Sequence, residues 1–235
     1  MTITVESSPV NVLTRSFNPF STTSASSSVG SNSFIYEPLL QFDAAKAGVI
    51  YPWLASKYAF SNGGKTVTFT IRPGVKFSNG TPLTPADVAF TYNLVKKNPA
   101  INTAGLTITS VTTSGDTVSL AFPSPQYTNL QNIASVYIVP ESVWAKVGNP
   151  ATYIDPNPVG TGPYTLGTFT PQGFTLARNP HYWQESKVRI QTLDFPAYAS
   201  NTDAEDALFS GQLTWAGNFV PNLKKLFLSK SPRNA

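Results

Sequence analysis

Residues 65–87 read KTVTFTIRPGVKFSNGTPLTPAD, and the chemistry of each part indicates its local structure. Apolar residues alternate with threonine over residues 66–71, which predicts a strand with one buried and one wet face. Pro73 and the glycine after it suit a type II turn, because proline restricts φ and glycine accepts a positive φ. Thr84, followed by proline and then Asp87, is typical of a helix start. The stretch therefore predicts a strand, a turn and a helix in succession.

Hairpins and short helices are expected on both sides of this stretch. Residues 59–61 are expected to pair with residues 66–71 across an Asn-Gly-Gly turn, and the helix to continue to about residue 98. Further strands are predicted over residues 106–113, 117–122, 164–170, 174–178, 188–195 and 213–215. Further helices are predicted over residues 34–40, 141–147 and 202–211, the last with Thr202 and Glu205 as its capping box. Hairpins mixed with isolated helices predict an α+β protein with a mixed sheet.

The composition is that of a folded protein with a nearly neutral surface. Charged residues make up 12% of the 235-residue chain and hydrophobic residues 41%. The net charge of +4 comes from residues 224–235, which hold four basic residues and no acid. We interpret this tail as a solvated terminus, although a basic tail can also bind nucleic acid or anionic lipid. The body of the chain has no basic patch, so nucleic acid is not expected as a partner.

Few residues could support catalysis or bind a metal. The chain has no cysteine, which excludes disulfides, thiolate metal sites and cysteine nucleophiles. Its single histidine, His181, lies in a Pro-His-Tyr-Trp turn, and no Gly-x-Ser-x-Gly elbow supports a hydrolase. Asp203, Glu205 and Asp206 cluster at an expected helix start, where acids favour the helix dipole. No catalytic residue, metal site or cofactor is therefore predicted.

Glu37 is the acid whose surroundings are most unusual. It lies between Tyr36 and Pro38 in an otherwise apolar segment, so it needs a partner if it is buried. We expect it to cap or bridge backbone groups rather than to transfer protons. The Gly160-Thr-Gly162 segment is not expected to be a phosphate-binding loop. It is too short, and no helix that would hold the phosphate follows it.

Residues 21–33 are mostly serine and threonine, but aromatic residues flank them on both sides. The aromatic anchors predict an ordered loop. Its small hydroxyl residues could let a ligand approach the backbone, or they could form a solvated surface loop. Both interpretations are open from the residues alone.

Five segments of the chain resemble the family 5 extracellular solute-binding proteins, the peptide- and oligosaccharide-binding receptors of bacterial ABC importers. The segments are residues 65–87, 17–20 (FNPF), 36–39 (YEPL), 157–164 (NPVGTGPY) and 179–183 (NPHYW). The resemblance implies a periplasmic-binding-protein-like lobe of type II, cluster C, with an inserted extra α+β domain. Residues 1–45 and 158–235 are then expected to form the first ligand-gripping lobe, and residues 46–157 the inserted domain. Members of the family are much longer, so the chain is expected to be an amino-terminal portion whose second, ligand-closing lobe is missing.

The same resemblance implies a binding function without bond making or breaking. The protein is expected to capture a peptide or a short oligosaccharide outside the membrane and to deliver it to an ABC permease. It is expected to be periplasmic or extracellular and monomeric at full length. The first 25 residues show no export signal or lipid-attachment cysteine, so a removed or clipped signal is expected.

Candidate ligand contacts are carried over from the family to segments near the expected cleft between lobes. They are Phe20, Ser31, Asn32, Trp215 and Asn218. Aromatic faces stack on sugar rings or peptide side chains, and hydroxyl and amide groups give directional hydrogen bonds. Each of these residues could instead belong to the core. Two other functions are open: a secreted hydrolase acting on glycans or peptides, and a standalone surface interaction domain.

Overall fold

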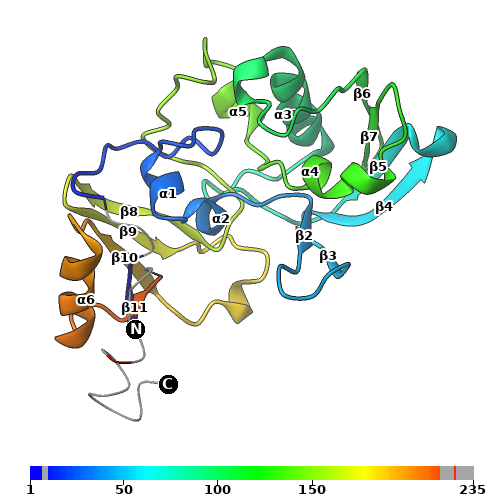
Figure 1. The fold of residues 1–235 in the computed structure, drawn as a ribbon. Helices are drawn as coiled ribbons and strands as arrows, with labels where there is room; N and C mark the ends of the chain where they lie inside the picture. Colours follow the sequence, from blue (N-terminus) through cyan, green and yellow to red (C-terminus); the bar gives the residue numbers. More distant parts are fainter. Residues whose placement is uncertain (7–9, 218–224, 226–235) are drawn as a thin grey trace.

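The computed structural model describes residues 1–6, 10–217 and 225, and its strands form two main sheets (Figure 1). The first sheet has the order β11-β1-β10-β9-β8. Its strands are β1 (Thr2–Glu6), β8 (Tyr164–Thr170), β9 (Gly173–Arg178), β10 (Thr192–Pro196) and β11 (Trp215–Ala216). Strand β1 runs parallel to β10 and to β11, whereas β9 is antiparallel to both β8 and β10. The sheet is therefore mixed, as predicted.

The sequence reading did not predict β1, which lies inside the first sheet. Ile3 pairs with Leu193, and Val5 pairs with Trp215. A five-residue strand whose partners lie about two hundred residues away has no hairpin turn to reveal it.

The second sheet has the order β4-β5-β7-β6. Its strands are β4 (Ala55–Ser61), β5 (Thr66–Ile71), β6 (Ser110–Ser114) and β7 (Thr117–Ala121). Val67 and Phe69 are fully buried, while Thr68 on the other face shares a 2.7 Å hydrogen bond with Ser119. The alternation predicted for residues 66–71 is therefore present. A two-stranded sheet of β2 (Leu40–Phe42) and β3 (Ile50–Pro52) leads into β4.

The strand predicted over residues 106–113 begins later, at Ser110. Asn102 explains the delay, because its side chain donates to the carbonyl of Leu106 and accepts from the Leu106 amide, at 2.9 and 2.8 Å. The Leu106 backbone is thereby satisfied without strand pairing. Residues 188–191 likewise precede β10 instead of belonging to it.

The longest helix of the described residues is α3 (Pro85–Lys97), and it begins where the sequence predicts. Thr84 and Asp87 form a reciprocal capping box, with each side chain bonded to the backbone of the other. Val88, Tyr92 and Val95 are buried, the first two in the core under the second sheet, and the Tyr92 hydroxyl donates to the Ile133 carbonyl at 2.6 Å. Local chemistry thus sets the start of α3, and packing orients it.

Replacing Thr84 by alanine is expected to lower the free energy of unfolding by about 1 kcal/mol, because the first turn of α3 loses a cap. Urea unfolding followed by circular dichroism measures the change. Thr107→Ala is the matched control, because Thr107 is exposed and outside the helices. Equal unfolding midpoints for the two variants would show that the cap is not needed.

Two helix predictions are wrong in detail. The helix expected over residues 34–40 is α2 (Asn32–Ile35), and residues 36–39 are not helical. Tyr36 is already extended, and Pro38 disfavours a helical conformation in Glu37, the residue before it. Helix α6 (Asn201–Phe209) is capped by Ser200, whose Oγ accepts from the Asp203 amide at 3.2 Å and donates to its carboxylate at 2.8 Å. Thr202 is therefore inside the helix rather than at its cap.

The remaining helices are short. They are α1 (Ala25–Ser28), α4 (Leu130–Ala134) and α5 (Glu141–Trp144), with 3-10 turns η1 (Asn62–Gly64), η2 (Pro99–Ile101), η3 (Tyr127–Asn129) and η4 (Glu185–Lys187). Figure 1 shows α1 and α2 between the first sheet and the region of α3 and α4.

The described residues form two large hydrophobic cores and a small cluster of Ala204, Ala207 and Leu213. One contains buried residues from Leu39 to Ile138 and includes the inner face of the second sheet. The other joins the first sheet to residues near the amino terminus, and it also takes in Val139 and Trp144. The chain leaves one core for the other near residue 39 and returns near residue 139.

Candidate ligand-binding site

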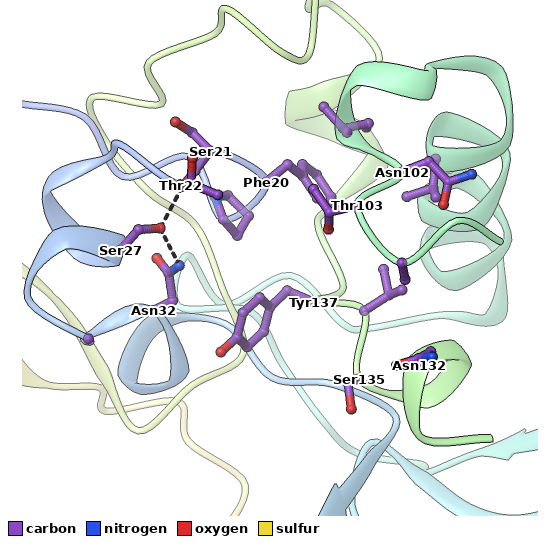
Figure 2. Close-up of a pocket in the computed structure, with 16 residues that line it drawn as sticks. Phe20, Ser21, Thr22, Ser27, Asn32, Asn102, Thr103, Asn132, Ser135 and Tyr137 are labelled. Atoms are coloured by element: carbon purple, nitrogen blue, oxygen red, sulfur yellow. Dashed lines mark hydrogen bonds between the residues drawn. The ribbon is translucent and has the colours of Figure 1, made fainter. Parts of the chain in front are cut away.

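A cavity of about 570 Å³ lies between residues 19–33, here called the serine-rich loop, and the region of α3 and α4. Residues 19–32 line one side, residues 95–104 line the opposite side, and residues 132–137 complete the lining (Figure 2). The volume falls within the range typical of small-molecule sites. The cavity thus joins a segment next to the first sheet with segments next to the second.

The serine-rich loop is held in place by its own hydroxyl groups. Ser24 caps α1 by accepting from the Ser27 amide at 3.2 Å. The Ser27 hydroxyl donates to the Ser21 carbonyl at 2.5 Å and accepts from Asn32 Nδ2 at 2.8 Å (Figure 2). The loop is therefore ordered, and four of its polar residues line the cavity: Ser21, Thr22, Ser27 and Asn32.

Phe20 and Asn32 are the two predicted ligand contacts that the structure brings together. Phe20 packs edge-on against Trp144, with ring centroids 5.3 Å apart, and it also lines the cavity. The Oδ1 atom of Asn32 is buried and has no hydrogen-bond partner within the described part of the chain. That atom is not accessible from the cavity, so Asn32 contributes to the lining through the rest of its side chain, whose Nδ2 donates to Ser27.

The other three predicted contacts lie elsewhere or outside the described residues. Ser31 is fully buried, and its hydroxyl donates to the Ser26 carbonyl at 3.3 Å instead of facing the cavity. Trp215 lies in β11, is 51% exposed and does not line the cavity. Asn218 falls outside the residues that the structure describes.

Sequence reasoning missed the far side of the cavity. The polar residues that line the cavity opposite the serine-rich loop are Asn102, Thr103, Asn132, Ser135 and Tyr137. These side chains lie outside the five resembling segments, and no local pattern joins them to the serine-rich loop. The only available signal was polar residues placed next to buried apolar ones, such as Ile101 and Ile133. Burial raises the pKa of Tyr137, so its hydroxyl stays protonated at neutral pH.

Glu37 is almost completely buried at the junction of the two cores, and aromatic side chains surround its carboxylate. Oε1 accepts from Trp53 Nε1 at 2.6 Å and from the Tyr182 hydroxyl at 3.0 Å. Oε2 accepts from Trp183 Nε1 at 3.2 Å. Burial raises the pKa of Glu37 to about 7, against the opposite effect of these donors. The guanidinium of Arg72 lies 4.5 Å from the Trp183 ring centroid.

The expectation that Glu37 bridges backbone groups is therefore wrong, because the partners of its carboxylate are side chains. They come from the start of the second sheet and from the turn after β9, so Glu37 ties together segments of both cores. The carboxylate is enclosed by donors and does not line the cavity. Its arrangement fits a structural joint.

His181 and the acidic residues do not form a second site. The His181 amide donates to Asn179 Oδ1 at 2.9 Å, and its side chain is exposed beside Gly80. Within residues 1–6, 10–217 and 225, no cluster of three or more histidine and acidic residues could hold a metal ion. Helices long and apolar enough to cross a bilayer are also absent from that part of the chain.

Comparison with known proteins identifies the family of the chain. The model of a family described as bacterial extracellular solute-binding proteins, family 5 Middle, matches residues 49–234, which is most of the chain. The chain belongs to this family. The predicted resemblance is thereby confirmed, although the match begins after the serine-rich loop.

The chain is also similar to individual proteins over part of their length. The oligopeptide-binding protein OppA of Bacillus subtilis is 28% identical over 202 residues, which cover 73% of this chain and 37% of that protein. Protein XP55 of Streptomyces lividans is 33% identical over 202 residues, covering 83% of this chain and 36% of that protein. The chain thus spans little more than a third of the length of these two relatives.

A solved family 5 structure shows the same fold. It is a periplasmic oligopeptide-binding protein of Thermotoga maritima with bound mannohexaose, which superposes with a TM-score of 0.85 at 24% identity. The superposition covers 98% of this chain and 43% of that protein. The predicted mixed α/β fold of the periplasmic-binding-protein type is confirmed.

Proposed function

We propose that the chain is the substrate-binding part of an ABC importer and that it captures a peptide or short oligosaccharide outside the membrane for delivery to the permease. The cavity of about 570 Å³ supports this most directly, because it has the size of a ligand site and is lined by hydroxyl-bearing and amide-bearing side chains. Membership of family 5 supports a binding role without turnover. The Thermotoga maritima protein holds mannohexaose, and the Bacillus subtilis protein is named for oligopeptides.

The arrangement of the chain gives this proposal a mechanical basis. We propose that residues 1–45 and 158–235 form one lobe and that residues 46–157 form an inserted domain, with the cavity where the two meet. Phe20 and Asn32 then contact the ligand from the first lobe. Trp215 is exposed in β11, where it is available to a second lobe that closes over the ligand. Ligand contacts to both lobes would favour the closed state by a shift of population.

A ligand screen by nuclear magnetic resonance tests the proposed function. The ¹⁵N-labelled 235-residue chain is titrated with pools of short peptides and of oligosaccharides, and shifts are followed at the Asn32 side-chain amide and the Tyr137 backbone amide. We expect at least one pool to shift these signals with weak, millimolar affinity, because a single lobe supplies part of the contacts. The exposed Asn11 side chain, outside the cavity, is the internal control. If no pool shifts the signals of the cavity residues, the proposal is contradicted.

A further inference from the structure

We propose that the cavity selects an uncharged oligosaccharide over a zwitterionic peptide or an acidic ligand. This inference rests on the proposed function and assigns a ligand class to the same site. The observations that carry it are the charge, the polar groups and the aromatic rings of the cavity lining.

The lining carries no formal charge. All 16 lining residues are apolar, hydroxyl-bearing or amide-bearing, and none is Asp, Glu, Lys, Arg or His. A peptide terminus, a carboxylated sugar or a charged chelate loses hydration when it enters such a site, and it meets no opposite charge from these residues in return. A neutral ligand avoids that cost. The lining therefore discriminates by charge before any specific contact is made.

The polar groups that remain match sugar hydroxyls. Asn102 is already committed to the backbone of Leu106, but Thr22, Thr103 and Ser135 bring hydroxyl groups to the lining. A sugar hydroxyl donates a hydrogen bond without bringing charge, and it can accept one from a neighbouring serine or tyrosine hydroxyl. Tyr137 contributes such a hydroxyl from the opposite side of the cavity (Figure 2).

Two aromatic rings border the same space. Phe20 comes from the serine-rich loop and Tyr137 from the segment after α4, and Figure 2 shows both rings at the cavity. Ring faces suit the apolar faces of sugar rings, while the surrounding hydroxyl and amide groups suit the sugar edges. The combination of neutral donors, neutral acceptors and aromatic rings points to a carbohydrate.

Matched sugars and peptides test the assignment on the 235-residue chain. The ¹⁵N-labelled protein is titrated separately with mannohexaose, cellohexaose, trigalacturonic acid and trialanine, and the Asn32 and Tyr137 signals are followed. We expect a neutral hexasaccharide to bind at least 10-fold more tightly than either charged probe. Stronger shifts with trialanine would overturn the sugar assignment while leaving a binding protein in place. Equal binding of trigalacturonic acid would overturn the charge argument, and no shift with any probe or pool would overturn the receptor proposal too.

Two variants localise the binding. Asn32→Ala is expected to weaken the affinity for the neutral hexasaccharide about 10-fold. Asn11→Ala, in the exposed amino-terminal segment, is expected to leave this affinity unchanged. Tyr137→Phe removes one hydroxyl and keeps the ring, so it is expected to weaken binding about 3- to 10-fold without affecting the fold. Dispersed amide spectra confirm folding of each variant. Unchanged affinity in both cavity variants would place the sugar elsewhere and overturn the proposal.

Discussion

Replacing Gly160 by alanine is expected to lower the free energy of unfolding by at least about 3 kcal/mol, because the added Cβ has no room. That atom would lie 1.9 Å from the carbonyl oxygen of Ile35 and 2.7 Å from its carbonyl carbon. Both are backbone atoms, so a side-chain rotation cannot relieve the clash. The Gly160 carbonyl also accepts from the Ser78 amide at 2.8 Å, which restricts movement of the loop.

Gly148→Ala is the matched control for this prediction. A Cβ at Gly148 meets nothing within 4 Å, and the residue does not need a positive φ. We expect its free energy of unfolding to change by less than about 0.5 kcal/mol. Urea unfolding followed by tryptophan fluorescence compares the two variants with the parent chain. If the Gly160 variant unfolds at the same urea concentration as the control, the close approach of this loop to residues 34–36 is wrong.

The stability of the protein is expected to fall as the pH rises from about 4.5 to about 7, because of Glu37. Its pKa is raised from 4.5 to about 7 in the folded protein, so the folded state binds the proton more tightly than the unfolded state. The stabilisation is complete below the unfolded pKa and is lost as the pH rises through the folded one. A shift of this size corresponds to about 3 kcal/mol.

Urea unfolding at several pH values between 4.5 and 8 measures this dependence in the parent chain and in Glu37→Gln. The variant does not titrate, so its free energy of unfolding is expected to fall by about 3 kcal/mol less than that of the parent over this window. The comparison is needed because burial also raises the pKa of Asp155, to about 6, and that carboxyl contributes with the same sign. Glu141→Gln, at an exposed acid, is the control. A parent and a Glu37 variant with identical pH profiles would refute the prediction.

The glycine and glutamate predictions concern the same junction. Glu37 lies where the chain first passes between the two cores, Gly160 packs against the preceding residues Ile35 and Tyr36, and the Gly162 amide donates to the Ile35 carbonyl at 2.9 Å. The two glycines therefore serve a close approach between backbones rather than phosphate binding. The buried acid and the glycine contact therefore hold residues 35–37 against segments that are distant in the chain.

Much of the candidate site was beyond the reach of sequence reasoning. Phe20 and Asn32 were found because the family resemblance implies that their segments lie near the ligand cleft. Tyr137 and Thr103 were missed, because nothing within their own segments indicates that they face that loop. Ser31 was expected at the ligand, but its hydroxyl and its amide both donate to the Ser26 carbonyl within the loop.

The sequence by itself determined the elements whose causes are local. The alternation over residues 66–71, the capping box of Thr84 with Asp87 and the family motifs all act within a few residues, so they can be read directly. Only the tertiary structure decided the place of β1 inside a sheet, the aromatic enclosure of Glu37 and the two-sided cavity. Each of these depends on contacts between segments far apart in the chain, whose geometry is set by packing and not by neighbouring residues.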